Sequence, residues 1–242
     1  MKKGSGKVAI YQKDSSDGDL TDKTTKAFFS GDNSFSRVEM KEVMDKVHLV
    51  KIDCELDNMK VASRFVRWTC SNLIEEIENI IDSEKEIKHS QITNKVEKML
   101  EKPEHIAKFI GSLPQKADAS LLEYPLGLLI QSGSTFTPNR LNVQSDQNKL
   151  TAETIYINAC GKYRDMNVMA SRTLLVNPDD TQKQTYIIAN EALEVLMKNL
   201  VVGEPVKKAY SATKEFLKSK DTQLAGKTHT NFGFGVSSIK IH

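Results

Sequence analysis

Residue types that could carry out catalysis are few and widely separated in this sequence. Cys160 could act as a nucleophile, but a cysteine hydrolase also needs a histidine and an acidic residue beside the thiol, and no motif supplies that pair. His229 could bind a metal ion, yet no carboxylate accompanies it, and no histidine occurs between His105 and His229. The Gly233-Phe234-Gly235 motif lacks the third glycine and the following helix of a phosphate-binding loop. We therefore expect a turn cysteine and a glycine-rich strand here, and no catalytic centre.

The stretch from Thr154 to Pro178 is predicted to form two strands joined by a tight turn. Ile155 and Ile157 alternate with polar residues, which is typical of a strand with two different faces. A second apolar run ends at Leu174-Leu175-Val176. The turn is expected at Cys160-Gly161-Lys162, because glycine adopts positive φ at little cost. The rest of the chain is expected to be organised around this hairpin.

Helices are expected before and after the hairpin. The clearest one runs from Cys54 to about Ser83, with apolar residues at helical spacing and Asp53 as its cap. A second, shorter helix follows, and a buried strand is predicted from Leu126 to Gln131 because the run is continuously apolar. Another long amphipathic helix is predicted from Asp179 to Val202, with Asn177 as its cap.

The first 52 residues are not expected to form an independent core. Strands are predicted at Lys7 to Lys13 and at Val47 to Ile52. A segment of this length, with two strands and one short helix, can hardly bury an independent core. It is therefore expected to be part of a larger lobe or a cover on the next domain.

Composition excludes several classes of protein. The 242 residues can hold one large domain or two small ones, and 39% hydrophobic with 27% charged residues is ordinary for a soluble protein. The net charge is +2, from 34 basic and 32 acidic residues, which is too balanced to argue for nucleic-acid binding. No apolar run approaches the length of a membrane span. The three cysteines are widely spaced, which indicates a reducing environment without a disulfide framework.

The hairpin resembles the metal-binding hairpin of the pita-bread peptidases, the superfamily of creatinase, aminopeptidase P and methionine aminopeptidase. Those enzymes carry an aspartate on each strand, the second shortly before an Arg-Thr pair, which here is Arg172-Thr173. The family's spacing places the two ligand positions at Asn158 and Met169, and two histidine positions at Phe232 and Ile239. A neutral amide lacks the charge of a carboxylate, and a thioether is too soft for these metal ions. The resemblance therefore implies the scaffold without its metal ligands.

Within this superfamily, the sequence is most similar to the peptidase-like domain of the large subunit of the FACT histone chaperones. The similarity is carried by short motifs spread over nearly the whole chain, namely Lys51 to Leu56, Leu129 to Ser134 with Phe136 and Pro138, Gly161 with Tyr163, Ala170 to Thr173, and Gly233 to Val236. The predicted order of helices and strands also follows that of the pita-bread fold. It implies an α+β protein with a curved antiparallel sheet and flanking helices. Residues 1–52 would be the remnant of an N-terminal α/β lobe, and residues 53–242 a truncated pita-bread domain that ends before its final strands.

The resemblance also implies a function. The chain would be a non-catalytic, histone-binding module of a FACT-type histone chaperone, acting in the nucleus and on the chromosome in nucleosome reorganisation during transcription, replication and repair. Core histones would be its partners, and the second FACT subunit would bind through regions outside this chain. Neither membrane binding nor strong direct nucleic-acid binding is expected. No catalytic, cofactor or metal site is expected, and Asn158, Met169, Phe232 and Ile239 would line a binding cleft.

Two alternatives have different consequences. A metal-dependent enzyme similar to aminopeptidases or prolidases would need metal ligands at the positions where this chain has unsuitable residues. An RNA- or ribosome-associated pseudoenzyme on the same scaffold would call for lysine-rich insertions, and the sequence contains none.

Overall fold

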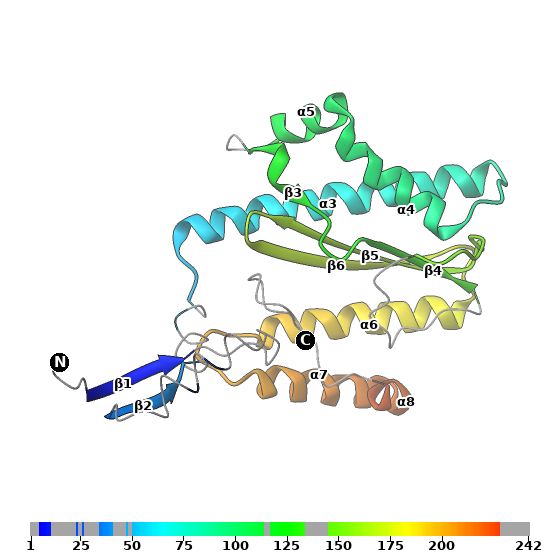
Figure 1. The fold of residues 1–242 in the computed structure, drawn as a ribbon. Helices are drawn as coiled ribbons and strands as arrows, with labels where there is room; N and C mark the ends of the chain where they lie inside the picture. The colour runs from blue at the N-terminus through cyan, green and yellow to red at the C-terminus, as the bar shows by residue number, and fades with distance from the viewer. Residues whose placement is uncertain are drawn as a thin grey trace. The chain divides into compact units, whose positions relative to one another are not determined.

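A computed structural model of the protein describes residues 5–10, 23, 26, 34–40, 47, 50–113, 117–133 and 145–227 (Figure 1). The chain falls into two compact units, Met1–Leu56 and Asp57–His242. The described part of each unit contains one sheet.

The first unit contains two parallel strands, β1 (Ser5–Ile10) and β2 (Ser34–Glu39), with Val8 opposite Arg37. Parallel strands cannot be joined by a tight hairpin turn and need a crossover connection. The segment between them includes Lys23 and Lys26, both of which are helical. This connectivity is that of an α/β arrangement.

The strand predicted at Val47 to Ile52 is wrong at its described positions. Val47 is helical, and residues 50–52 form no strand. Val50 and Ile52 are 76% and 62% exposed, so neither side chain is buried against a sheet. The N–H of Ile52 instead donates to Glu55 Oε2 at 3.0 Å, a contact typical of a helix start. The segment therefore leads into the next helix.

The sheet of the second unit has four antiparallel strands, with β5 at its centre. β5 pairs with β6 along its whole length and with β4 and β3 on its other side. The strands are β3 (Leu122–Glu123), β4 (Leu128–Ser132), β5 (Thr154–Tyr163) and β6 (Met166–Leu175). Ile157 of β5 lies between Ile130 of β4 and Arg172 of β6.

Helices from the first half of the chain cover one face of this sheet (Figure 1). They are α3 (Asp53–Asp82), α4 (His89–Glu97), the 3₁₀ helix η1 (Lys98–Glu101) and α5 (Pro103–Gly111), and a second 3₁₀ helix, η2 (Ala119–Leu121), precedes β3. The predicted long helix is confirmed, although Asp53 is its first residue. The apolar stripe of α3, including Leu73 and Ile77, packs with Ile157 into the main core, so the spacing that predicted the helix also positions it.

The predicted hairpin is confirmed, but its turn does not lie at Cys160-Gly161-Lys162. β5 continues through Gly161 to Tyr163, and the turn is formed by Arg164 and Asp165, with Arg164 at φ +54°. Gly161 is instead important for the packing of α3 on β5. A Cβ atom there would lie 2.7 Å from both Phe65 Cδ1 and Val66 Cγ2, so the absence of a side chain lets α3 approach the strand closely.

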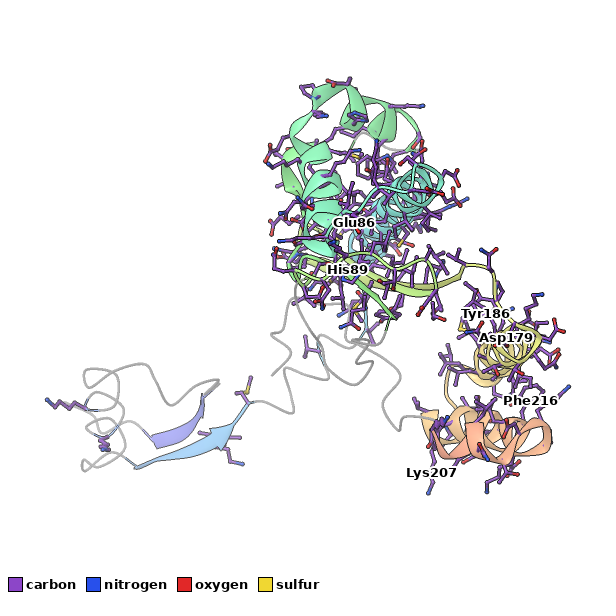
Figure 2. The ribbon with its side chains drawn as sticks, turned by 90° about the vertical axis from the view of Figure 1, so that its right-hand side faces the viewer. Glu86, His89, Asp179, Tyr186, Lys207 and Phe216 are labelled. Carbon is purple, nitrogen blue, oxygen red and sulfur yellow. The ribbon has the colours of Figure 1, made fainter. Side chains whose placement is uncertain are left out.

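The remaining described helices form a separate small cluster. They are α6 (Asp180–Asn199), α7 (Val206–Lys220) and α8 (Thr222–Gly226), and Ile188, Ala192 and Leu217 are among the residues buried between them. Figure 2 shows Phe216 on α7, partly buried against the same cluster. None of the described helices is both long and apolar enough to cross a membrane.

The cap of α6 is Asp179, and the prediction of Asn177 was wrong. Asp179 Oδ1 accepts the N–H of Gln182 at 2.7 Å, and Gln182 Oε1 accepts the N–H of Asp179 at 3.0 Å. This reciprocal capping box satisfies two groups at the helix start. Asn177 has φ +48° and belongs to the preceding turn.

The contact between α3 and Gly161 can be tested by adding a methyl group. Gly161→Ala should lower the free energy of unfolding by about 1–3 kcal/mol, because the core must shift to admit the new atom. Urea unfolding of the full chain measures the change. Gly111→Ala in α5 is the matched control: no atom lies within 4 Å of its added Cβ, so stability should stay the same or rise slightly. Equal stability of Gly161→Ala and wild type would contradict the proposed packing role.

Candidate functional site

The hairpin presents a polar row on the sheet face opposite α3. Ile155 and Ile157 point into the core, so the alternating residues Tyr156 and Asn158 point to the other side. The hydroxyl oxygens of Tyr156 and Ser171 are 2.9 Å apart. The Asn158 amide nitrogen donates to both, at 3.2 Å to Tyr156 and 3.0 Å to Ser171. The three side chains are hydrogen-bonded to one another.

Asn158 and Met169 lie on neighbouring strands and face the same side of the sheet. Asn158 is opposite Ser171, and Met169 is opposite Cys160, so the two predicted positions are diagonal neighbours. The corresponding Cα atoms in such pairs are roughly 7–8 Å apart. Phe232 and Ile239 lie outside the described residues. A cleft lined by all four therefore stays a prediction.

The described side chains at the two strand positions do not fit a catalytic divalent metal ion. The Asn158 amide is neutral, so its oxygen, the atom that would bind a metal, lacks the charge of a carboxylate. Met169 offers only a thioether, which is a poor ligand for zinc, manganese or cobalt in an oxygen and nitrogen site. Elsewhere in the described ranges, no group of three or more histidine, cysteine, aspartate or glutamate side chains is placed to hold a metal.

Cys160 does not have the surroundings of a nucleophile. It lies within β5 rather than in a turn and is only 5% exposed. Burial raises the pKa of its thiol, which disfavours the reactive thiolate. The structure therefore supports a packing role for Cys160.

A hydrogen-bond chain joins the buried side chains of His89 and Ser132 to the partly exposed side chain of Asp146. His89, which is labelled in Figure 2, is the first residue of α4 and is completely buried. Its Nδ1 is 2.6 Å from Asp146 Oδ1, and its Nε2 is 2.7 Å from Ser132 Oγ. Because 43 and 57 residues separate His89 from these partners, no local motif reveals the group.

The hydrogen-bonded side chains of Ser132, His89 and Asp146 are the residue types of a serine-hydrolase triad, but a substrate could not reach them. Ser132 is 2% exposed, and its Oγ also accepts the N–H of Thr151 at 3.0 Å. A nucleophilic serine must reach a substrate carbonyl. The arrangement instead ties α4 to the end of β4 and to the segment that contains Asp146 and Thr151.

Asp146 is held in its charged form. Partial burial raises its pKa, but hydrogen bonds from His89 and from both the backbone and the side chain of Asn148 outweigh burial, and the pKa lies below its usual range. An ionised carboxylate can only accept hydrogen bonds, so His89 Nδ1 must carry a proton. In neutral His89, Nε2 then accepts the Ser132 hydroxyl proton.

The described architecture and site define a class of protein. The antiparallel sheet, the helices packed on one of its faces and the hairpin with its polar outer row are arranged as in the pita-bread fold. The prolidase from Pyrococcus furiosus shares it, with a TM-score of 0.62 at 16% identity over 90% of this chain and 56% of that structure. A profile of metallopeptidase family M24 matches residues 57–242. The chain belongs to metallopeptidase family M24.

Within that family, the chain is similar to subunits of the FACT complex. It is 28% identical to FACT complex subunit SPT16 of Gibberella zeae and 28% identical to FACT complex subunit ctc-2 of Neurospora crassa, in each case over 98% of this chain. The solved N-terminal domain of FACT complex subunit SPT16 from Eremothecium gossypii matches with a TM-score of 0.84 at 22% identity, over 96% of this chain and 55% of that one. The chain spans about a quarter of the length of these curated relatives, 23% in both cases.

If the hydrogen bonds between Asp146, His89 and Ser132 stabilise the fold, stability should fall in acid. The folded-state pKa of Asp146 is depressed, so its carboxylate stabilises the fold above the ordinary aspartate pKa, and this contribution is lost as the pH falls below about 4. Asp146→Asn should therefore lower the free energy of unfolding at neutral pH by about 1 kcal/mol, with a smaller difference from wild type in acid.

Thermal unfolding followed by circular dichroism at several pH values measures this difference. Asp165→Asn, in the exposed turn of the hairpin, is the matched control and should leave stability unchanged. A difference between Asp146→Asn and wild type that is the same in acid and at neutral pH would contradict the carboxylate's role.

Proposed function

We propose that this chain is a non-catalytic, histone-binding module of a FACT-type histone chaperone. The observation that carries the proposal is its similarity to FACT complex subunits over 98% of its length. The neutral and thioether side chains at the two former ligand positions support the non-catalytic part. Without carboxylates, a bound metal ion would not be held where it could activate water.

The scaffold suits a binding role even without chemistry. Helices α3 and α4 hold the sheet from one face, and the polar row of the hairpin lies on the other. A surface of this kind keeps its shape when metal ligands are lost, because the ligands do not contribute to the apolar core. Peptide recognition by such a surface is a recurring use of exposed sheets.

The proposal places the protein in the nucleus, on chromosomes, where it would act in nucleosome reorganisation during transcription, replication and repair. Core histones would be its direct partners, and the second FACT subunit would bind through regions outside this chain. The net charge of +2 does not favour strong direct binding to nucleic acid.

The proposed lack of peptidase activity is directly testable. The purified chain should not hydrolyse a proline dipeptide with added zinc, manganese or cobalt, and these ions should not raise its Tm. A Tm shift reports metal binding to the folded state even where turnover is missing. The prolidase of Pyrococcus furiosus is a positive control for the assay. Turnover that survives repurification and is abolished by a chelator would show an active enzyme.

Histone binding is tested by competition with RNA. The immobilised chain should retain a core histone tetramer at physiological salt and not a structured RNA, and retention should weaken as salt rises because charge steers the encounter. Bovine serum albumin on the same support controls for non-specific capture. Retention of RNA without histones would favour the RNA-associated alternative and exclude the chaperone role.

A further inference from the structure

A hollow of about 340 Å³ opens at the end of strand β6, and we refer to it as the β6 hollow. Ile77 and Ile81 of α3 form one side, and Leu174 and Val176, at the end of β6 and just beyond it, form another. Tyr186 of α6, which is labelled in Figure 2, also lines the hollow. Its side chain is 44% exposed. This volume is at the small end of ligand sites, which hold roughly 300–1,000 Å³. It suits an aliphatic side chain of a larger partner.

The charge beside the β6 hollow is negative. Glu78 lines it, and Glu75 and Asp82 share the same face of α3 because they lie three residues before and four residues after it. All three are exposed, and none of them is in an ion pair among the described residues. Glu76, by contrast, is paired with Lys95 at 2.6 Å. A partner with lysine or arginine next to its aliphatic residue would complement this face.

The nearest basic side chain on β6 does not neutralise this face. The Arg172 guanidinium donates to the Ser171 carbonyl oxygen at 2.8 Å. Burial raises the pKa of the Cys70 thiol on α3, and the charge of Arg172 opposes that rise. Cys70 and Glu78 are eight residues apart in the helix, which corresponds to roughly 12 Å along its axis. The acidic face near the hollow therefore remains available to a cationic ligand.

Strand β6 offers main-chain groups next to the hollow. Within the described residues, β6 pairs with β5 alone, so its second edge is a rim of the described sheet. Thr173 to Leu175, the last part of this rim, and Val176 just beyond the strand also line the hollow. An extended peptide can add to such an edge through backbone hydrogen bonds, while alternate side chains enter neighbouring pockets.

We propose that the β6 hollow binds an extended peptide segment in which an aliphatic residue is flanked by lysine or arginine. The aliphatic side chain occupies the hollow, a cationic side chain pairs with Glu78, and the peptide backbone pairs with the edge of β6. This inference rests on the proposed function, since it names the surface at which a basic protein such as a histone is held.

The test uses the full chain and two probes. One is a short fluorescent peptide in which leucine alternates with lysine, together with a copy whose outward backbone nitrogens are methylated and cannot pair with a strand. The other is the core histone tetramer. Fluorescence anisotropy gives the affinity of each probe for wild type, Glu78→Lys and Tyr186→Ser. Glu215→Lys, an exposed charge reversal on α7, is the matched control.

Wild type should bind the unmodified peptide. Glu78→Lys and Tyr186→Ser should each lower its affinity roughly fivefold, a change of about 1 kcal/mol. Glu215→Lys should match wild type, and the methylated peptide should bind far more weakly. Circular dichroism confirms that each variant is folded. No binding by wild type, equal binding by Glu78→Lys, or equal binding of the methylated peptide would overturn the inference.

The measurements with the histone tetramer distinguish a failure of this inference from a failure of the proposed function. Histone binding that is unaffected by Glu78→Lys and Tyr186→Ser would remove the β6 hollow as the histone site and leave the proposed function standing. Peptide binding at the hollow without any histone binding would refute the proposed function, and the hollow would then be a site for another basic peptide.

Discussion

The close packing of helix α3 on strand β5 is the contact on which the rest of the second unit depends. Phe65 and Val66 lie directly over Gly161, where any side chain would collide with them. Both large core clusters of this unit contain residues of α3 and of β5, one including Leu73 and the other Phe65. Helices α4 and α5 then pack onto the ends of this two-layer centre. The absence of a side chain at Gly161 therefore allows the two layers to approach closely at this position.

This arrangement separates stability from surface chemistry. Ile155, Ile157 and Ala159 of β5 face α3 and are aliphatic and buried, whereas Tyr156 and Asn158 on the opposite face form hydrogen bonds with Ser171. Changes in that outer row cost little core packing, because they remove no buried apolar contact. A member of a metallopeptidase family can thus carry unsuitable residues at ligand positions and retain its fold, since the sheet is held from its other side.

The spacing of apolar residues in the sequence correctly predicted helices and strands whose apolar faces pack into the core. The helical spacing of Leu73 and Ile77 identified α3, and the alternation around Ile157 identified β5. The turn was misplaced because a glycine required for helix packing has the same local appearance as a glycine required for positive φ. The hydrogen bonds of His89 could not be predicted, because Ser132 and Asp146 are distant from it in sequence. The three side chains meet only after the sheet and α4 have formed.

Trp68 gives the molecule a built-in optical probe of one part of the fold. It is the only tryptophan in the chain, and its ring lies 6.1 Å from that of Phe65 and 5.6 Å from that of Phe109, between α3 and α5. Its emission therefore reports on this aromatic cluster, whereas circular dichroism also registers α6, α7 and α8. Coincident transitions in the two signals would show that the helices near the end of the described chain melt together with the sheet, and separate transitions would show that they melt on their own.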